Sequence, residues 1–240
     1  MYWSPLEQFE IKPLLQLNSL YTLSLTNYVI YIVLVGSIIY GYSAIIGPKV
    51  VSSRWSLAIE TINDTISNLT QREGAYLPLL FTTFNVILVA NLISMIPYSM
   101  AITAQLVLII SWSLTLWIGN VLIGLRLHRL EYFGLFVPTG TPLALVPVLV
   151  VIETLSYSSR AISLGLRLSA NILSGHLLMV ILGGLILSLM STSTAGLVGG
   201  IIPITGVVAI VCLEFGISVI QAYVFSILLI GYIRDSVNLH

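Results

Sequence analysis

The chain has 240 residues, of which 58% are hydrophobic and only 8% charged, and its formal net charge is zero. A mean hydropathy of +1.05 excludes an ordinary soluble domain, which needs far more surface charge. The neutral balance offers nucleic acid no basic surface. The single Cys212 excludes an internal disulfide and a cysteine-rich metal site. Glu7, Glu10 and Lys12 precede the first apolar run, so we expect no cleavable secretory signal.

Gaps between the charged residues divide the chain into five membrane spans. An apolar helix of about 20 residues crosses the roughly 30 Å of hydrocarbon in a bilayer. The expected spans cover about residues 25–46, 76–96, 100–124, 141–190 and 195–237. Gly47-Pro48 ends the first span, and Pro97-Tyr98-Ser99 marks the turn between the second and the third. The sequence therefore predicts an all-α polytopic protein that forms a single membrane domain and carries no metal or other cofactor.

The segment over about residues 51–71, between the first two spans, has a different pattern. Apolar side chains recur at steps of four and three: Trp55, Ile59, Ile62, Ile66 and Leu69. Polar side chains fill the other face: Arg54, Glu60, Asp64, Ser67 and Gln71. This pattern predicts an amphipathic helix on the membrane surface. The alternative is a helix that packs on another subunit.

Basic residues outside the spans indicate the orientation of the chain. Five crossings place the loops over residues 49–72 and 126–129 on one side, together with Arg234. The turns near Pro97 and over residues 191–194 fall on the opposite side and carry no charge. The positive-inside rule assigns the basic side to the cytoplasm-equivalent compartment.

The last two apolar segments are too long to cross a bilayer upright. As unbroken helices, residues 141–190 would measure about 75 Å and residues 195–233 about 58 Å. We therefore expect two long, strongly tilted helices that form an antiparallel hairpin, a shape that suits a curved partner. Ala161, Gly165 and Ser169 form a row of small residues on one face, which would let another helix approach closely.

Charged residues inside these two segments are the candidate functional residues. An arginine at mid-bilayer costs roughly 2.5–3.5 kcal/mol on insertion scales, so such residues are usually functional. One polar stripe follows helical spacing along the first long segment: Glu153, Ser156, Arg160, Ser163, Arg167, Asn171 and Ser174. Lipid offers this stripe no partner, so we expect water or polar groups against it. The alternative for Arg167 is a buried ion pair that holds helices together.

His176 lies nine residues after Arg167 and faces away from the stripe. Histidine titrates near neutral pH and can relay a proton; its alternative role is a hydrogen bond to a neighbouring carbonyl. Folding the two long segments into a hairpin brings His176 near the level of Glu214. The same counting pairs Arg167 with Gln221, and Glu153 with Asp235, at successive levels. This layout is typical of two offset half-channels separated by a fixed positive charge.

Four stretches of the chain resemble one known family. They are the run Ile162-Ser-Leu-Gly-Leu-Arg-Leu-Ser-Ala-Asn-Ile-Leu-Ser-Gly-His-Leu-Leu-Met179, the preceding Pro147–Tyr157, the upstream Asn91–Ser99, and Ser4–Ile11 near the start. Together they resemble the subunit a family of F-type ATP synthases in its fungal mitochondrial form. The resemblance covers nearly the whole chain in order. It implies a multi-pass protein of the mitochondrial inner membrane. Fungal members lose a few N-terminal residues, and whether residues 1–3 are removed here stays open from the sequence.

The resemblance also implies roles for individual residues. The arginine matching Arg167 faces a carboxylate on each subunit of a rotating c ring. His176 and Glu214 match the proton inlet from the intermembrane space, and bacterial members exchange the two residue types at these positions. Other matches are the matrix-side outlet Glu153 and Asp235, and the polar partners Asn171 and Gln221; Arg160, Ser163 and Ser174 are further candidates.

The family resemblance further implies a proton-channel subunit that is not catalytic by itself. Its expected partners are the c ring, the peripheral stalk and other F0 stator subunits, the F1 sector and the lipid bilayer. We find no nucleotide-binding loop. Two other classes stay open from the residues alone: a carrier that works by itself, although interrupted half-helices are not evident, and a structural subunit of a respiratory complex, although only His176 lies inside a span.

Overall fold

The computed structural model of the chain describes residues 9–16, 24–45, 54–70, 74–96, 99–137, 142, 145–192 and 199–237. In chain order its elements are β1 (Pro13–Gln16), β2 (Ser24–Thr26), α1 (Asn27–Ile45), α2 (Arg54–Thr70), η2 (Gly74–Tyr76), α3 (Leu77–Ser94), η3 (Ile102–Ala104), α4 (Leu106–His128), η4 (Arg129–Phe136), α5 (Val146–Thr192) and α7 (Ile201–Val237). Five helices in these ranges are long and apolar enough to cross a membrane. The predicted all-α architecture with five spans is confirmed.

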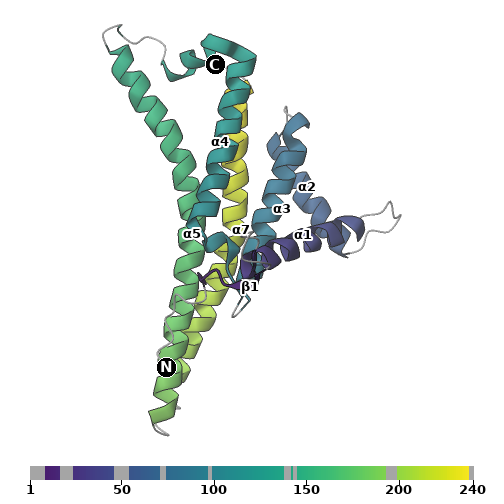
Figure 1. Cartoon of the computed structure of the whole chain (residues 1–240), viewed down its shortest axis with the longest axis vertical. Helices are drawn as coiled ribbons and strands as arrows, with labels where there is room; N and C mark the ends of the chain where they lie inside the picture. The colour runs from purple at the N-terminus through teal and green to yellow at the C-terminus, as the bar shows by residue number, and fades with distance from the viewer. Residues whose placement is uncertain are drawn as a thin grey trace.

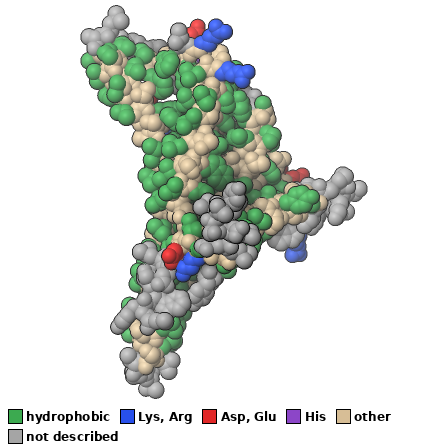
Figure 2. All heavy atoms as spheres, viewed as in Figure 1, with side chains coloured by type: hydrophobic (Ala, Val, Ile, Leu, Met, Phe, Trp, Pro, Cys, Tyr) green, Lys and Arg blue, Asp and Glu red, His purple; other side chains and the backbone are tan. Residues whose placement is uncertain are grey.

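Apolar side chains dominate the outside of the molecule. Figure 2 shows them over most of the visible face, while charged side chains gather at its upper end and in a second group lower down. A soluble protein does not expose so large a contiguous apolar surface. This surface suits lipid as the solvent.

The third span begins at Leu106 instead of about residue 100. Ala104 and Gln105 donate their amides to the carbonyls of Ala101 and Ile102, which makes one tight turn, and the extended backbone of Gln105 (φ −73°, ψ 99°) then separates this turn from α4. The turn is buried, and Ser169 donates its hydroxyl to the Ala104 carbonyl at 2.8 Å. Irregular backbone is tolerated at membrane depth only where protein covers it, and here α3 and α5 provide that cover.

A two-stranded hairpin before α1 is a feature that the sequence did not predict. β1 and β2 are antiparallel. The side chain of Asn27 joins the hairpin to the helix, because its Oδ1 accepts bonds from the amides of Lys12 (3.2 Å) and Tyr28 (2.9 Å). Asparagine at the start of a helix satisfies amides that lack an intrahelical partner. This local capping fixes where α1 begins.

The amphipathic helix is α2, and the chain itself covers part of its apolar face. Ile66 is buried, and Ile62 and Leu69 pack against the same core as Leu80 and Phe84 of α3. Arg54, Glu60 and Asp64 are exposed. The periodicity therefore located the helix correctly, while its apolar stripe faces α3 and α7 over its second half.

α4, α5 and α7 form the core of the molecule. Leu164 and Leu168 of α5 pack with Ala222 and Phe225 of α7 in one buried cluster. The small-residue row lies in this interface, since a Cβ on Gly165 would stand 2.8 Å from Ser113 Oγ and 3.3 Å from the Ile109 carbonyl of α4. Close approach of α4 therefore depends on the missing side chain at this position, as the sequence predicted.

The two long helices form the predicted antiparallel hairpin. α5 has 47 residues and α7 has 37, which correspond to about 70 Å and 55 Å. Figure 1 shows them side by side over their lower parts, with the upper part of α5 leaning away from α4 and α7. Tyr157 lies against Tyr232, with ring centroids 5.2 Å apart, and Gly175 lies against Glu214. These contacts reproduce the register obtained by counting to within one residue.

Candidate functional site

Arg167 lies on a face of α5 that the chain leaves uncovered. Its side chain is exposed, as are those of Arg160, Ser163 and Ser174 on the same stripe, whereas Asn171 is half-buried. The opposite face, which includes Leu164, Gly165 and Leu168, is buried against α4 and α7. Lys12 forms an ion pair with Glu10, whereas Arg167 forms none with a described residue. Its charge is therefore available to a partner.

His176 and Glu214 lie together inside the molecule. The two residues are 5% and 4% exposed, which is rare for ionisable side chains in such apolar surroundings. The imidazole contacts the backbone of Ser94 and the ring of Phe9, with ring centroids 6.1 Å apart. Its Nε2 and both carboxylate oxygens of Glu214 have no hydrogen-bond partner among the described residues. Water is the natural partner for such groups, so the site can hold and pass on protons.

Polar groups of α3 extend this site, and the sequence reasoning missed them. Asn91 and Ser94 are fully buried, and Asn91 donates its Nδ2 to the Ser218 carbonyl at 3.3 Å. The Oδ1 of Asn91 and the Nε2 of Gln221 have no partner in the described part of the chain. Two polar residues three positions apart in the otherwise apolar second half of α3 are a signal that could have indicated a shared polar face.

A second polar region lies around Asp235, at the other end of α7 from Glu214. A cluster of tyrosines surrounds it. Tyr132, Tyr157 and Tyr232 pack with Phe136. The side chains of Tyr132 and Tyr157 interact with each other, and the buried hydroxyl of Tyr232 has no hydrogen-bond partner among the described residues. Asp235 acts electrostatically on all three tyrosines, and Arg160 acts on Tyr232. Burial raises the pKa of Tyr132, which lies in η4 outside the spans, so its phenol stays neutral. The sequence reasoning did not identify these tyrosines.

Glu153 and Asp235 differ in exposure. Glu153 is exposed, one helical turn before Tyr157, whereas Asp235 is half-buried. The structure thus places His176 and Glu214 in buried positions on neighbouring turns of α5 and α7 and brings Arg160 and Asp235 both near Tyr232, while Arg167 and Glu153 are exposed. No group of three His, Cys, Asp or Glu residues suited to a metal ion occurs in the described ranges.

The two buried polar regions are separated by a distance that matches a membrane. Glu214 and Asp235 are 21 residues apart on α7, or about 31 Å along the helix axis. Hydrocarbon is about 30 Å thick. Arg167 lies between them in level, since the contacts of Tyr157 with Tyr232 and of Gly175 with Glu214 lie on either side of it along α5.

Gly175 positions the Glu214 carboxylate, and its substitution provides a test. A Cβ on Gly175 would stand 2.7 Å from Glu214 Oε1. Gly175→Ala therefore displaces the flexible carboxylate, while the backbone of α5 can stay in place. We expect proton flux through reconstituted vesicles to fall roughly tenfold, the effect of about 1.4 kcal/mol. Gly183→Ala is the control, because a Cβ there meets nothing within 4 Å. Equal flux in the two variants would exclude a role for this contact.

Comparison with known proteins identifies the family. The family model described as ATP synthase A chain matches residues 22–234. The chain is 64% identical over 246 residues to ATP synthase subunit a of Candida albicans, with all of both chains covered. It is 65% identical to ATP synthase subunit a of Candida parapsilosis over the same coverage. With ATP synthase subunit a of Saccharomyces cerevisiae it shares 49% identity over 99% of this chain and 96% of the relative. The chain therefore belongs to the ATP synthase A chain family.

Proposed function

We propose that this chain, as the proton-translocating F0 subunit of an ATP synthase, forms two offset half-channels that serve a rotating ring of c subunits. Arg167 is the fixed charge between the half-channels. The observation that carries the proposal is the exposed Arg167, which forms no ion pair with the described residues, on a helix face that lies level between two buried polar regions. An exposed arginine within a membrane span requires a polar or anionic partner, and a c-ring carboxylate meets that requirement.

The inlet half-channel consists of His176 and Glu214, with Asn91 and Gln221 beside them. A proton that reaches Glu214 passes to the c-ring carboxylate through water held by the unpartnered oxygens and nitrogens of this region. The neutralised carboxylate can then leave Arg167 and enter the lipid, because a neutral acid costs far less to transfer than an ion. Asn171 and Ser174, next along the stripe, line the approach to the ring.

The outlet half-channel lies towards Asp235 and Glu153. After nearly a full turn of the ring, the carboxylate meets the other side of Arg167, which favours its ionised form. The released proton passes to the Asp235 region, where the hydroxyls of Tyr132, Tyr157 and Tyr232 offer hydrogen-bonding groups for water. Arg160 and Ser163 lie on the stripe between Arg167 and Glu153.

The fixed charge serves as a barrier. Moving one charge through 100 mV yields about 2.3 kcal/mol, so ATP synthesis uses several protons and tolerates no leak. A guanidinium does not deprotonate in proteins and cannot itself carry the proton across. A protein-lined water path past Arg167 would dissipate the gradient.

The names of the fungal relatives support the setting of this activity. We place the chain in the mitochondrial inner membrane, beside the c ring on the exposed stripe of α5. The remaining F0 stator subunits, including the peripheral stalk, cover other apolar faces, and the F1 sector carries out ATP chemistry. The chain is not catalytic by itself.

Passive proton flux tests the proposal. Vesicles carrying the membrane sector with Arg167→Ala are expected to leak protons, while the complete complex loses ATP synthesis. Arg126→Ala removes an exposed arginine beyond the spans and is expected to change neither quantity. If flux and synthesis both stay at wild-type values in Arg167→Ala, then Arg167 is structural and the proposed barrier lies elsewhere.

A further inference from the structure

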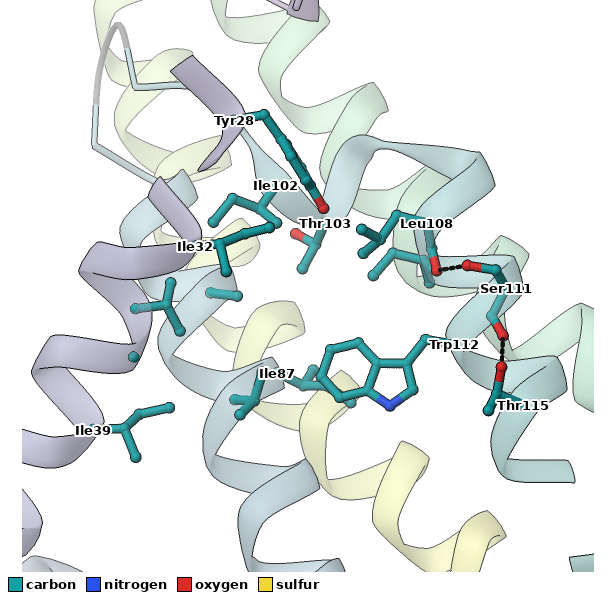
Figure 3. A pocket seen from close by; sticks show the side chains of 15 residues that line it. Tyr28, Ile32, Ile39, Ile87, Ile102, Thr103, Leu108, Ser111, Trp112 and Thr115 are labelled. Atoms are coloured by element: carbon teal, nitrogen blue, oxygen red, sulfur yellow. Dashed lines mark hydrogen bonds between the residues drawn. The ribbon is translucent and has the colours of Figure 1, made fainter. Parts of the chain in front are cut away.

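A cavity of about 530 Å³ lies between α1, α3, η3 and α4, apart from both polar regions described above. Its wall includes Val35 from α1, Ile87 from α3, Ile102 from η3, and Leu108 and Trp112 from α4 (Figure 3). None of the residues that line it is charged. Cavities of about 300–1,000 Å³ hold ligands of small-molecule size.

Two unpartnered hydroxyls face this cavity. Thr103 is 2% exposed, and neither its Oγ1 nor the hydroxyl of Tyr28 has a hydrogen-bond partner among the described residues. Figure 3 shows the two side chains pointing toward one another, from η3 and α1. A buried hydroxyl without a partner costs free energy, so this pair indicates a missing hydrogen-bond acceptor.

Thr103 is an exception among the hydroxyl residues around this cavity. Ser111 and Thr115 donate to the carbonyls of Leu108 and Ser111, three and four residues earlier in α4. Thr103 belongs to a single tight turn, and the residues before it, Met100 and Ala101, are not helical. Its hydroxyl therefore has no helical carbonyl to bond and stays available to a ligand.

The size of the cavity favours one acyl chain over a helix as the occupant. A helix 10–12 Å across fills on the order of 500 Å³ in each turn of 5.4 Å, so the cavity would accept only about one turn. An acyl chain is narrower and apolar, as the wall requires. An empty apolar cavity in contact with lipid lacks dispersion contacts along its wall. Entry of an acyl chain restores these contacts and is therefore favourable.

The two hydroxyls lie at one end of the cavity (Figure 3). Tyr28 is the second residue of α1, and Thr103 lies three residues before α4. Val35 and Ile87 lie further along their helices. A carbonyl between the hydroxyls would therefore direct its acyl chain along the apolar wall.

We propose that this cavity binds one acyl chain of a bilayer phospholipid, with an ester carbonyl accepting hydrogen bonds from Tyr28 and Thr103. The bound chain completes the packing of α1. Among residues 27–44 of α1, only 6% are buried inside the protein. The site lies away from Arg167, His176 and Glu214, so it is independent of the proposed proton path.

The first test blocks the cavity. Phosphatidylcholine with a diazirine in the middle of one acyl chain is titrated into the detergent-solubilised ATP synthase complex, irradiated, and mapped on peptides. We expect saturable labelling of peptides from α1 and α3 that line the cavity. Gly36→Leu should reduce it about tenfold or more by filling the space. Gly41→Leu is the matched control: a Cβ at either glycine meets nothing within 4 Å, but only Gly36 lines the cavity.

The second test removes a hydroxyl without changing the shape of the cavity. Thr103→Val and Tyr28→Phe should each raise the probe concentration that gives half-maximal labelling about fivefold, the effect of one hydrogen bond of ordinary strength. Labelling that is equal in Gly36→Leu and Gly41→Leu would overturn the proposal. So would a wild-type complex whose cavity peptides take up no probe, because another group would then occupy the site.

Discussion

Replacing Arg167 by lysine is expected to abolish coupled ATP synthesis although the formal charge of the stripe does not change. The guanidinium offers a planar set of donors that matches a carboxylate, and it stays charged at any working pH. An ammonium loses the second hydrogen bond, and desolvation lowers the pKa of lysine. Losing one charge-assisted bond of 1.5–3 kcal/mol alone corresponds to a roughly 10- to 150-fold lower rate, and a lysine that loses its proton would add a leak that removes the remaining coupling.

The measurement is ATP synthesis by the reconstituted complex under an imposed proton gradient, alongside passive flux through its membrane sector. Arg126→Lys serves as the control, since Arg126 is exposed beyond the apolar part of α4. Synthesis at the wild-type rate in Arg167→Lys would show that a positive point charge suffices. The proposed requirement for the planar set of guanidinium donors would then be wrong.

The long helices were predictable because lipid imposes simple rules on sequence. Charged residues are so costly in hydrocarbon that their absence marks each span, and helix length follows from the rise per residue. The hairpin register was predictable for the same reason: regular helices make counting reliable. The contacts of Tyr157 with Tyr232 and of Gly175 with Glu214 differ from that count by one residue.

The departures from the prediction all involve irregular backbone or tertiary cover. Residues 100–105 are as apolar as a span, and only their packing against α3 and α5 makes a non-helical turn possible there. The hairpin of β1 and β2 depends on Asn27, whose capping bonds reach back to Lys12 and Glu10. Periodicity located α2 but could not show that α3 and α7 of the same chain cover its stripe.

The candidate site was predictable only where charge made it conspicuous. Arg167, His176 and Glu214 are ionisable groups in apolar runs, so the sequence alone singled them out. Asn91 and the three tyrosines are neutral, and their importance appears only when the fold buries their polar atoms. Glu153 and Asp235 share a level by counting, but Glu153 is exposed whereas Asp235 is half-buried.

Replacing Glu214 by glutamine is expected to stop proton flux through the inlet. Glutamine keeps the shape of the side chain, which lies against Gly175, so we expect the complex to assemble. An amide cannot accept and release a proton at working pH. Loss of a proton-transfer group lowers rates by on the order of 10²–10⁴, and both passive flux and ATP synthesis should fall by that order. Glu131→Gln, an exposed carboxylate in η4, should change neither.

Combining the two variants separates a half-channel from a general loss of structure. Arg167→Ala alone should leak, because the barrier is removed while the inlet still conducts. Adding Glu214→Gln should bring passive flux back towards a low value, since protons no longer reach the opened barrier. A double variant that leaks as much as Arg167→Ala would show that protons bypass Glu214. Other residues would then form the inlet. Flux that falls in the double variant, with the complex assembled, places Glu214 and Arg167 on one path in that order.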